Sequence, residues 1–183
     1  VAIARQLYAI DPADPDGARR LAMALRYAGV VHRTNYRDSE ARVAVEESLR
    51  IARRLLERDP LDAGALKLFV ITTEVYAQVL GDAGAYAQSY ALGAEVYDAQ
   101  LKLVRLAGNA PGALRSLAAS TSTRGTNHYN GKDYSGACRW WREALNVYLG
   151  LERRGVLTET DREKGVPELR NYLAKGCENG PPR

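Results

Sequence analysis

Apolar side chains recur along most of this chain at spacings of three and four residues. The clearest stretch is residues 137–148, where the apolar positions share one face of a helix. These positions are Ala137, Trp140, Trp141, Ala144, Leu145 and Tyr148. The alternation of apolar and polar residues that indicates β-strands is almost absent. The pattern therefore predicts an all-α protein.

The helical pattern returns after 48 residues. The segment IARQLYAIDP at residues 3–12 corresponds to IARRLLERDP at 51–60, and GAL at 64–66 corresponds to GAL at 112–114. Related residues occupy equivalent positions in three successive copies, as in Glu47, Glu95 and Glu143 or in the small residues Gly29, Ala77 and Gly125. Self-similarity at one fixed period indicates a repeat protein. The predicted organisation is the end of an earlier unit followed by three units, at residues 1–12, 14–61, 62–109 and 110–157.

Each unit divides into two helices joined by a short turn. The turn is LGDAGAY at residues 80–86 in the second unit and NGKDY at 130–134 in the third, where Asn-Gly is the helix breaker. Gly155 follows two arginines and is a typical stop at the end of the second helix of the third unit. Each unit is therefore predicted to be an antiparallel helix pair.

The stretch GKDYSGACRWWREAL at residues 131–145 resembles the tetratricopeptide repeat (TPR), a helix–turn–helix unit. Gly125 corresponds to the small eighth residue of that motif, and Asp133, Tyr134 and Ala137 follow in register. The resemblance covers about residues 1–157 and implies an α-α superhelix, a solenoid of antiparallel helix pairs with a concave wall. The usual period is about 34 residues. The extra length here predicts that the second helix of each pair is about three turns longer than usual.

The pattern changes after Gly155. Thr158 and Asp161 have the spacing of a capping box, and Pro167 is expected to break or restart the helix that follows. Residues 158–176 are predicted to form a capping helix over the last repeat, and 177–183 a disordered tail. The order of these features resembles the C-terminal end of repeat regions attached to bacterial serine/threonine protein kinases.

The family resemblance implies that the first helix of each pair lines the concave wall. The residues it places there are Met23, Arg26, Val30, Arg33 and Thr34, then Ile71, Glu74, Gln78, Gly81 and Asp82, then Ala119, Ser122, Thr126, Tyr129 and Asn130. The mixture of basic, acidic, amide and hydroxyl groups suits an extended peptide or a partner helix. The partner-binding residues selected from this set are Arg26, Val30, Arg33, Glu74, Gln78, Ser122, Thr126, Tyr129 and Asn130.

Composition narrows the classes of function. Hydrophobic residues make up 46% and charged residues 26% of the 183 residues, as in a soluble globular domain. No apolar run approaches the ~18 residues of a membrane span, and no secretory signal pattern is present. The net charge of +4 is spread over the helices without a basic stripe. Neither a membrane nor a nucleic acid is therefore expected as a partner. The start at Val1, in mid-helix and without Met, favours a fragment of a longer protein.

Groups for catalysis or metal binding are not arranged in any recognised pattern. His32 and His128 lie in the same column of two different units, too far apart to share a metal, and no zinc-ligand spacing occurs. No nucleophile, base and orienting group can be assigned, so no enzyme activity and no cofactor are expected. Cys138 and Cys177 allow a disulfide, but two unpaired thiols are the prediction, which suits a reducing compartment such as the cytoplasm.

Two functional hypotheses follow. The first is a non-catalytic interaction or scaffolding module that binds a protein, a peptide or a second copy of itself. The alternative is a regulatory or sensor arm of a larger signalling enzyme, such as a protein kinase, or of a transcription regulator. A nucleic-acid-binding repeat has only the isoelectric point of about 9.1 in its favour.

Overall fold

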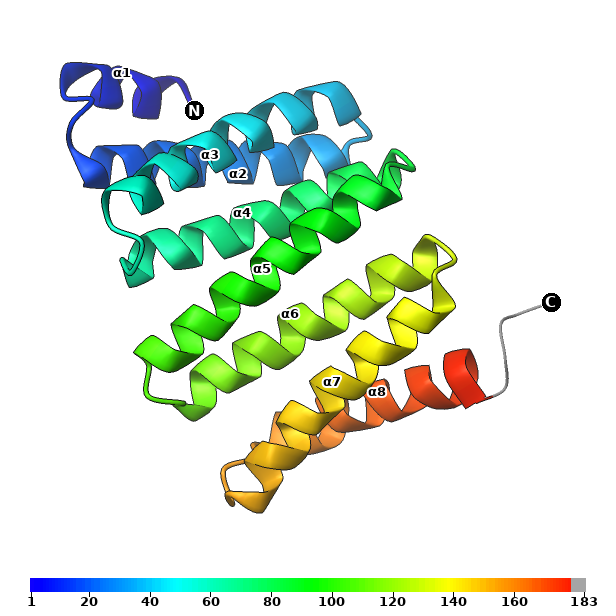
Figure 1. Ribbon diagram of the computed structural model, residues 1–183. Helices are drawn as coiled ribbons and strands as arrows, with labels where there is room; N and C mark the ends of the chain where they lie inside the picture. Colours follow the sequence, from blue (N-terminus) through cyan, green and yellow to red (C-terminus); the bar gives the residue numbers. More distant parts are fainter. Residues whose placement is uncertain (179–183) are drawn as a thin grey trace. The chain divides into compact units, whose positions relative to one another are not determined.

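The computed structural model describes residues 1–178, which form eight α-helices and two π-helical segments without any strand (Figure 1). The α-helices are α1 (Ala2–Ile10), α2 (Pro15–Thr34), α3 (Asp38–Arg58), α4 (Ala63–Asp82), α5 (Tyr86–Leu106), α6 (Pro111–Asn130), α7 (Tyr134–Arg153) and α8 (Val166–Leu173). The π-helical segments are η1 (Asp161–Gly165) and η2 (Ala174–Glu178). Consecutive helices pack as pairs, which confirms the predicted all-α class.

The helix bounds repeat with the period seen in the sequence. The first helices of the pairs start at Pro15, Ala63 and Pro111, and the second helices at Asp38, Tyr86 and Tyr134. The prediction assigns the extra length mostly to the second helix, but the two helices of a pair are almost equally long. In the first pair α2 has 20 residues and α3 has 21, so both helices share the extra length.

The turn inside each pair has one geometry, although its sequence differs between the units. The residues with positive φ are Tyr36, Gly84 and Lys132, each at the same place in its unit. In each turn the N–H of the residue that follows the positive-φ residue donates to a carbonyl at the end of the first helix, for example Asp133 N to His128 O at 2.9 Å. These bonds satisfy the last carbonyls of the helix. In the third unit the left-handed residue is Lys132 and not the neighbouring Gly131.

The small residues at equivalent positions of the three units, Gly29, Ala77 and Gly125, form what we call the small column. At Gly29 and Gly125 this position lies where the two helices of a pair cross. A Cβ atom on Gly29 would lie 2.2 Å from Val45 Cγ2, and one on Gly125 would lie 2.4 Å from Trp141 Cδ1. Both distances are far below van der Waals contact. Glycine is therefore required at these positions, because the side chain of the second helix fills the space above the backbone of the first.

The chain divides into two compact units, Val1–Ala99 and Gln100 onward. In unit 1, α2 packs against both α3 and α4 around Leu25, Val45 and Leu66, which are almost completely buried. Asp14 and Asp62, one period apart, cap α2 and α4 by accepting backbone N–H bonds. Helix α4 is apolar and long enough to cross a membrane, but 61% of its apolar window is buried, as in the core helix of a soluble protein.

Unit 2 contains α6, α7 and the C-terminal helical segment, which packs against α7 (Figure 1). Gly155, at φ +68°, ends the turn after α7, and a reciprocal capping box joins Thr158 and Asp161. The helix is π-helical just before Pro167, whose missing N–H interrupts the normal ladder. Helical structure continues through Cys177 to Glu178, past the predicted end at 176. The rest of the predicted tail, 179–183, lies outside the described residues.

Candidate interaction surfaces

The predicted partner-binding residues of unit 1 lie on α2 and α4, which pack side by side. Arg33 joins the two helices: its Nε lies 2.5 Å from Asp82 Oδ2, and its Nη1 donates to Gln78 Oε1 at 2.9 Å. These hydrogen bonds bring side chains of α2 and α4 together. The positive charge of Arg33 is already neutralised within the wall, which leaves an amide and a carboxylate beside it.

Arg26 and Val30 on α2 and Glu74 on α4 are the other predicted residues of unit 1. The guanidinium of Arg26 lies over the ring of Tyr27, with 4.3 Å between Cζ and the ring centroid. Val30 and Glu74 are both half-buried. Arg26 is therefore held by a ring of its own helix, a contact that adds about 0.5–1 kcal/mol at an exposed site.

Unit 2 contains a cavity of about 290 Å³ between α6 and the C-terminal helical segment. It is lined by Ala119, Ser122, Thr123 and Thr126 of α6, by Tyr148 of α7, and by Gly165, Glu168, Leu169 and Tyr172. Two predicted residues, Ser122 and Thr126, thus line a cavity together. We call this the α6–α8 cavity.

Most hydroxyl protons around the α6–α8 cavity are used inside the protein. Thr123 donates to Ala119 O at 3.2 Å, and Thr126 donates to Ser122 O at 3.3 Å. Tyr172 donates its hydroxyl proton to Glu168 Oε1, and this hydrogen bond, helped by burial, raises the pKa of Tyr172. Thr123, Thr126 and Tyr172 therefore present oxygen lone pairs, and so act as hydrogen-bond acceptors toward a ligand.

Tyr129 and Asn130, the other two predicted residues of unit 2, do not line the cavity. Tyr129 packs edge-on against Tyr134, with ring centroids 5.3 Å apart, and contacts Trp141 at 5.5 Å. Trp141 in turn stacks on Tyr172 at 5.0 Å. Asn130 is exposed at the end of α6. Tyr129 thus belongs to an aromatic cluster that fixes the C-terminal segment on the repeat.

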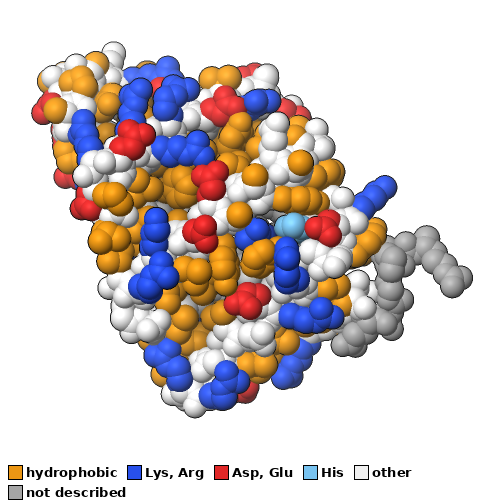
Figure 2. Space-filling model, in the orientation of Figure 1, with side chains coloured by type: hydrophobic (Ala, Val, Ile, Leu, Met, Phe, Trp, Pro, Cys, Tyr) orange, Lys and Arg blue, Asp and Glu red, His pale blue; other side chains and the backbone are white. Residues whose placement is uncertain are grey.

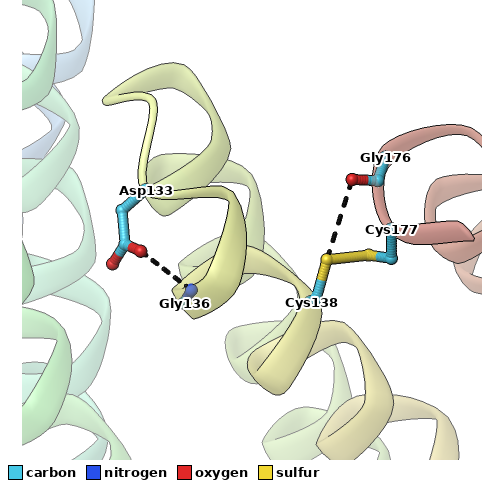
Figure 3. Close-up of a disulfide and its surroundings, with 5 residues drawn as sticks. All are labelled: Asp133, Gly136, Cys138, Gly176 and Cys177. Atoms are coloured by element: carbon cyan, nitrogen blue, oxygen red, sulfur yellow. Dashed lines mark hydrogen bonds between the residues drawn. A yellow bond between two sulfur atoms is a disulfide. The ribbon is translucent and has the colours of Figure 1, made fainter. Parts of the chain in front are cut away.

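Figure 3 shows the disulfide that joins Cys138 of α7 to Cys177 of η2. The two Cα atoms lie 5.8 Å apart, because η2 packs against α7 at the end of the returning segment. The prediction of two unpaired thiols is therefore wrong. Cys138 Sγ also lies 3.8 Å from Gly176 O. A disulfide sulfur carries no proton, so this is a packing contact and not a hydrogen bond.

His128, near the end of α6, pairs with Asp133, the residue just before α7. His128 is buried, and its Nδ1 lies 2.7 Å from Asp133 Oδ2. Asp133 Oδ1 accepts a hydrogen bond from Gly136 N at 2.9 Å, which Figure 3 shows. Burial lowers the pKa of His128, although Asp133 opposes the shift. The pair caps α7 and connects it to α6.

An ion pair with a buried carboxylate joins α6 to η1. Arg115 Nε lies 2.7 Å from Asp161 Oδ2, and Asp161 also accepts from Thr158 N. Burial alone would raise the pKa of Asp161, but the bonds from Arg115 and Thr158 outweigh it and lower that pKa. This pair fixes the start of the C-terminal segment relative to α6.

Charges of both signs are interspersed over the face shown in Figure 2. The described residues contain no group of three or more His, Cys, Asp or Glu that could hold a metal ion.

Sequence reasoning missed one wall of the α6–α8 cavity. Glu168, Leu169 and Tyr172 lie on the C-terminal helix, which was assigned only a capping role. The signal was present: Glu168 and Tyr172 are four residues apart, so they share one helix face. Assigning these residues to a cavity required knowing that this face of the C-terminal helix lies opposite α6.

Residues 21–62 match the family model described as "Tetratricopeptide repeat". The match covers most of α2, all of α3 and the cap of α4, which is one helix pair of the structure. No curated protein and no solved structure matches the chain significantly. The resemblance to the repeat regions of bacterial protein kinases stays a prediction.

Proposed function

We propose that this chain, a TPR-like repeat protein, is a non-catalytic interaction module that binds a peptide or partner helix along the first helices of its pairs. Repeats of this family generally mediate protein–protein interaction or scaffolding. The observation that carries the proposal is the α6–α8 cavity, which leaves part of α6 uncovered. The cavity is lined by Ser122 and Thr126, two of the residues selected from the family pattern.

The wall of unit 1 supports the same function by a different chemistry. Gln78 and Asp82 present an amide and a carboxylate next to the half-buried Arg33. Such groups bind the main chain and polar side chains of an extended peptide. A peptide bound along this wall would find its hydrogen-bond partners already fixed by the contact between α2 and α4.

The test is selection from a displayed library of random peptides, followed by a cavity-filling variant. Ser122→Trp places a large ring in the α6–α8 cavity, whereas Ser135→Trp places the same ring on an exposed position of α7. Both variants are first checked for native helicity by circular dichroism. We expect wild type and Ser135→Trp to retain the selected peptides and Ser122→Trp to lose them. Failure of wild type to select any peptide, or unchanged binding by Ser122→Trp, would overturn the proposal.

A second copy of the chain is the other possible partner, and it must be distinguished from a peptide. Analytical ultracentrifugation of the purified protein detects self-association directly.

Localisation to the cytoplasm stays a prediction. The argument for it from free thiols no longer holds, because Cys138 and Cys177 form a disulfide and disulfides persist mainly in oxidising compartments.

A further inference from the structure

We propose that the α6–α8 cavity binds one basic side chain, a lysine or an arginine, of the peptide ligand. This inference rests on the proposed function and names the chemistry of one subsite within it. It follows from three properties of the cavity: the direction of its hydrogen bonds, its charge and its apolar walls.

The hydrogen bonds leave acceptors facing the cavity. Thr123 and Thr126 both donate to carbonyls of their own helix, so their oxygen lone pairs remain for a ligand. Tyr172 donates to Glu168 Oε1, so both the phenol oxygen and the second carboxylate oxygen can accept. Lysine and arginine carry donors only. They complement these acceptors, whereas a carboxylate or phosphate would meet lone pairs at Thr123, Thr126 and Tyr172 and could accept only from the hydroxyls of Ser122 and Tyr148.

The charge of the cavity also favours a positively charged group of the ligand. Glu168 is the one acidic or basic side chain among the described lining residues. Helix α6 carries two guanidinium groups: that of Arg115 is bound to Asp161 and to Val156 O, and that of Arg124 lies over the Trp140 ring, 3.6 Å from its centroid. The charge of Arg115 is therefore compensated elsewhere, and Glu168 gives the cavity a net negative charge.

The walls suit the apolar stem that precedes a basic head group. Tyr148, Leu169 and Tyr172 contribute two rings and an aliphatic chain. A Cβ on Gly165 would lie 3.1 Å from the hydroxyl oxygen of Tyr148, so glycine lets this ring pack closely against the helix. Lysine and arginine bury their stems on such surfaces, and a cation gains further from a ring face. The volume of about 290 Å³ is small for a whole ligand and matches one side chain.

The test uses capped single amino acids as probes for the full chain labelled with ¹⁵N. Nα-acetyl-lysine amide and Nα-acetyl-arginine amide are titrated and compared with the glutamine and glutamate analogues. We expect the basic probes to shift the backbone amide signals of Thr126 and Glu168 at millimolar concentration. The shifts should weaken with added salt, as for an attraction between exposed charges. Equal shifts with the glutamate probe, or no shift with any probe, would overturn the assignment.

A matched pair of variants separates charge from shape. Glu168→Gln keeps an acceptor for Tyr172 and removes the charge, while Glu159→Gln removes an exposed charge outside the cavity. We expect Glu168→Gln to weaken binding of the basic probes by about three- to tenfold, the range for a partly exposed charged hydrogen bond. Glu159→Gln should leave binding unchanged. Equal affinities for Glu168→Gln and wild type would contradict the proposal.

The outcome distinguishes this inference from the proposed function. If displayed peptides bind wild type and not Ser122→Trp, while the basic probes fail, then the surface binds peptides but the subsite chemistry is wrong. If both experiments fail, the proposed function fails with it. If acidic or phosphorylated peptides are selected, the acceptor argument is wrong.

Discussion

The two units of the chain use the same helix pair but hold neighbouring elements together by different interactions. In unit 1 an ion pair recurs with the period of the repeat: Arg5 binds Glu47, and Arg53 binds Glu95. In unit 2, α7 is joined to the C-terminal segment by a disulfide and by stacking of Trp141 on Tyr172.

The difference separates what a repeat needs from what it can vary. Exposed ion pairs contribute about 0–1 kcal/mol each, whereas a disulfide typically contributes about 2–4 kcal/mol. The close crossing at the small column is common to both units, at Gly29 and Gly125. The crossing thus defines the pair, and the interactions between neighbouring elements are adapted to each place in the chain.

The largest expected effect comes from breaking the disulfide of unit 2. Its cysteines are 39 residues apart, so the chain-entropy relation gives a loss of about 4 kcal/mol on reduction. We expect hydrogen exchange in α8 and η2 to accelerate with dithiothreitol while α2 and α3 keep their protection. The Cys138→Ala/Cys177→Ala variant should show the fast exchange with and without reductant. Equal protection of α8 before and after reduction would contradict the prediction.

The second prediction concerns the helix crossing. Gly125→Ala forces a Cβ against the buried ring of Trp141, and overpacking of this kind costs about 1–3 kcal/mol. Gly29→Ala meets one methyl group of Val45 and should cost less, because a small side chain shifts more easily. Gly112→Ala, with no atom within 4 Å of the new Cβ, is the control and should be neutral or stabilising. Urea unfolding of the three variants measures the order, and a loss for Gly112→Ala as large as for Gly125→Ala would refute the explanation.

These two predictions rest on features that the sequence revealed to different degrees. The column of Gly29, Ala77 and Gly125 was visible, because a close crossing restricts side-chain size at one position of every unit. The pairing of Cys138 with Cys177 was not visible, because it depends on the path of the C-terminal segment back along α7. That path is set by the turn at Gly155 and by packing, neither of which has a periodic signature.

The candidate site shows the same limit. Ser122 and Thr126, which line the α6–α8 cavity, were selected because the family pattern assigns a face to the first helix of the pair. Glu168 and Tyr172 lie after the last repeat, where no pattern assigns a face. Tyr129 was placed on the binding wall, but its ring packs against those of Tyr134 and Trp141. Local periodicity therefore predicts which residues share a helix face, and only packing decides what that face meets.

The third prediction uses the buried histidine of unit 2. The pKa of His128 is lowered by burial, so the folded state resists protonation more than the unfolded state does. Its contribution to stability is therefore complete above the ordinary histidine pKa of about 6.5, and it is lost as the pH falls from there through the lowered pKa of the folded state. His128→Leu, which copies the buried Leu80 of the second unit, should reduce the loss of stability between about pH 7.5 and 5. His32→Leu, the same change in unit 1, is the control, and an unchanged pH profile for His128→Leu would contradict the prediction.

The smallest expected effect is that of the repeated ion pair in unit 1. A double-mutant cycle on Arg53→Gln and Glu95→Gln should give a coupling energy of about 0–1 kcal/mol that decreases with added salt, because both side chains are largely exposed. The same cycle on Arg5→Gln and Glu47→Gln should agree within about 0.5 kcal/mol, the usual error of additivity, since each partner lies one period earlier. A coupling above about 2 kcal/mol in either cycle would exceed the range for surface pairs. It would mean that unit 1 depends on its ion pairs as strongly as unit 2 depends on its disulfide.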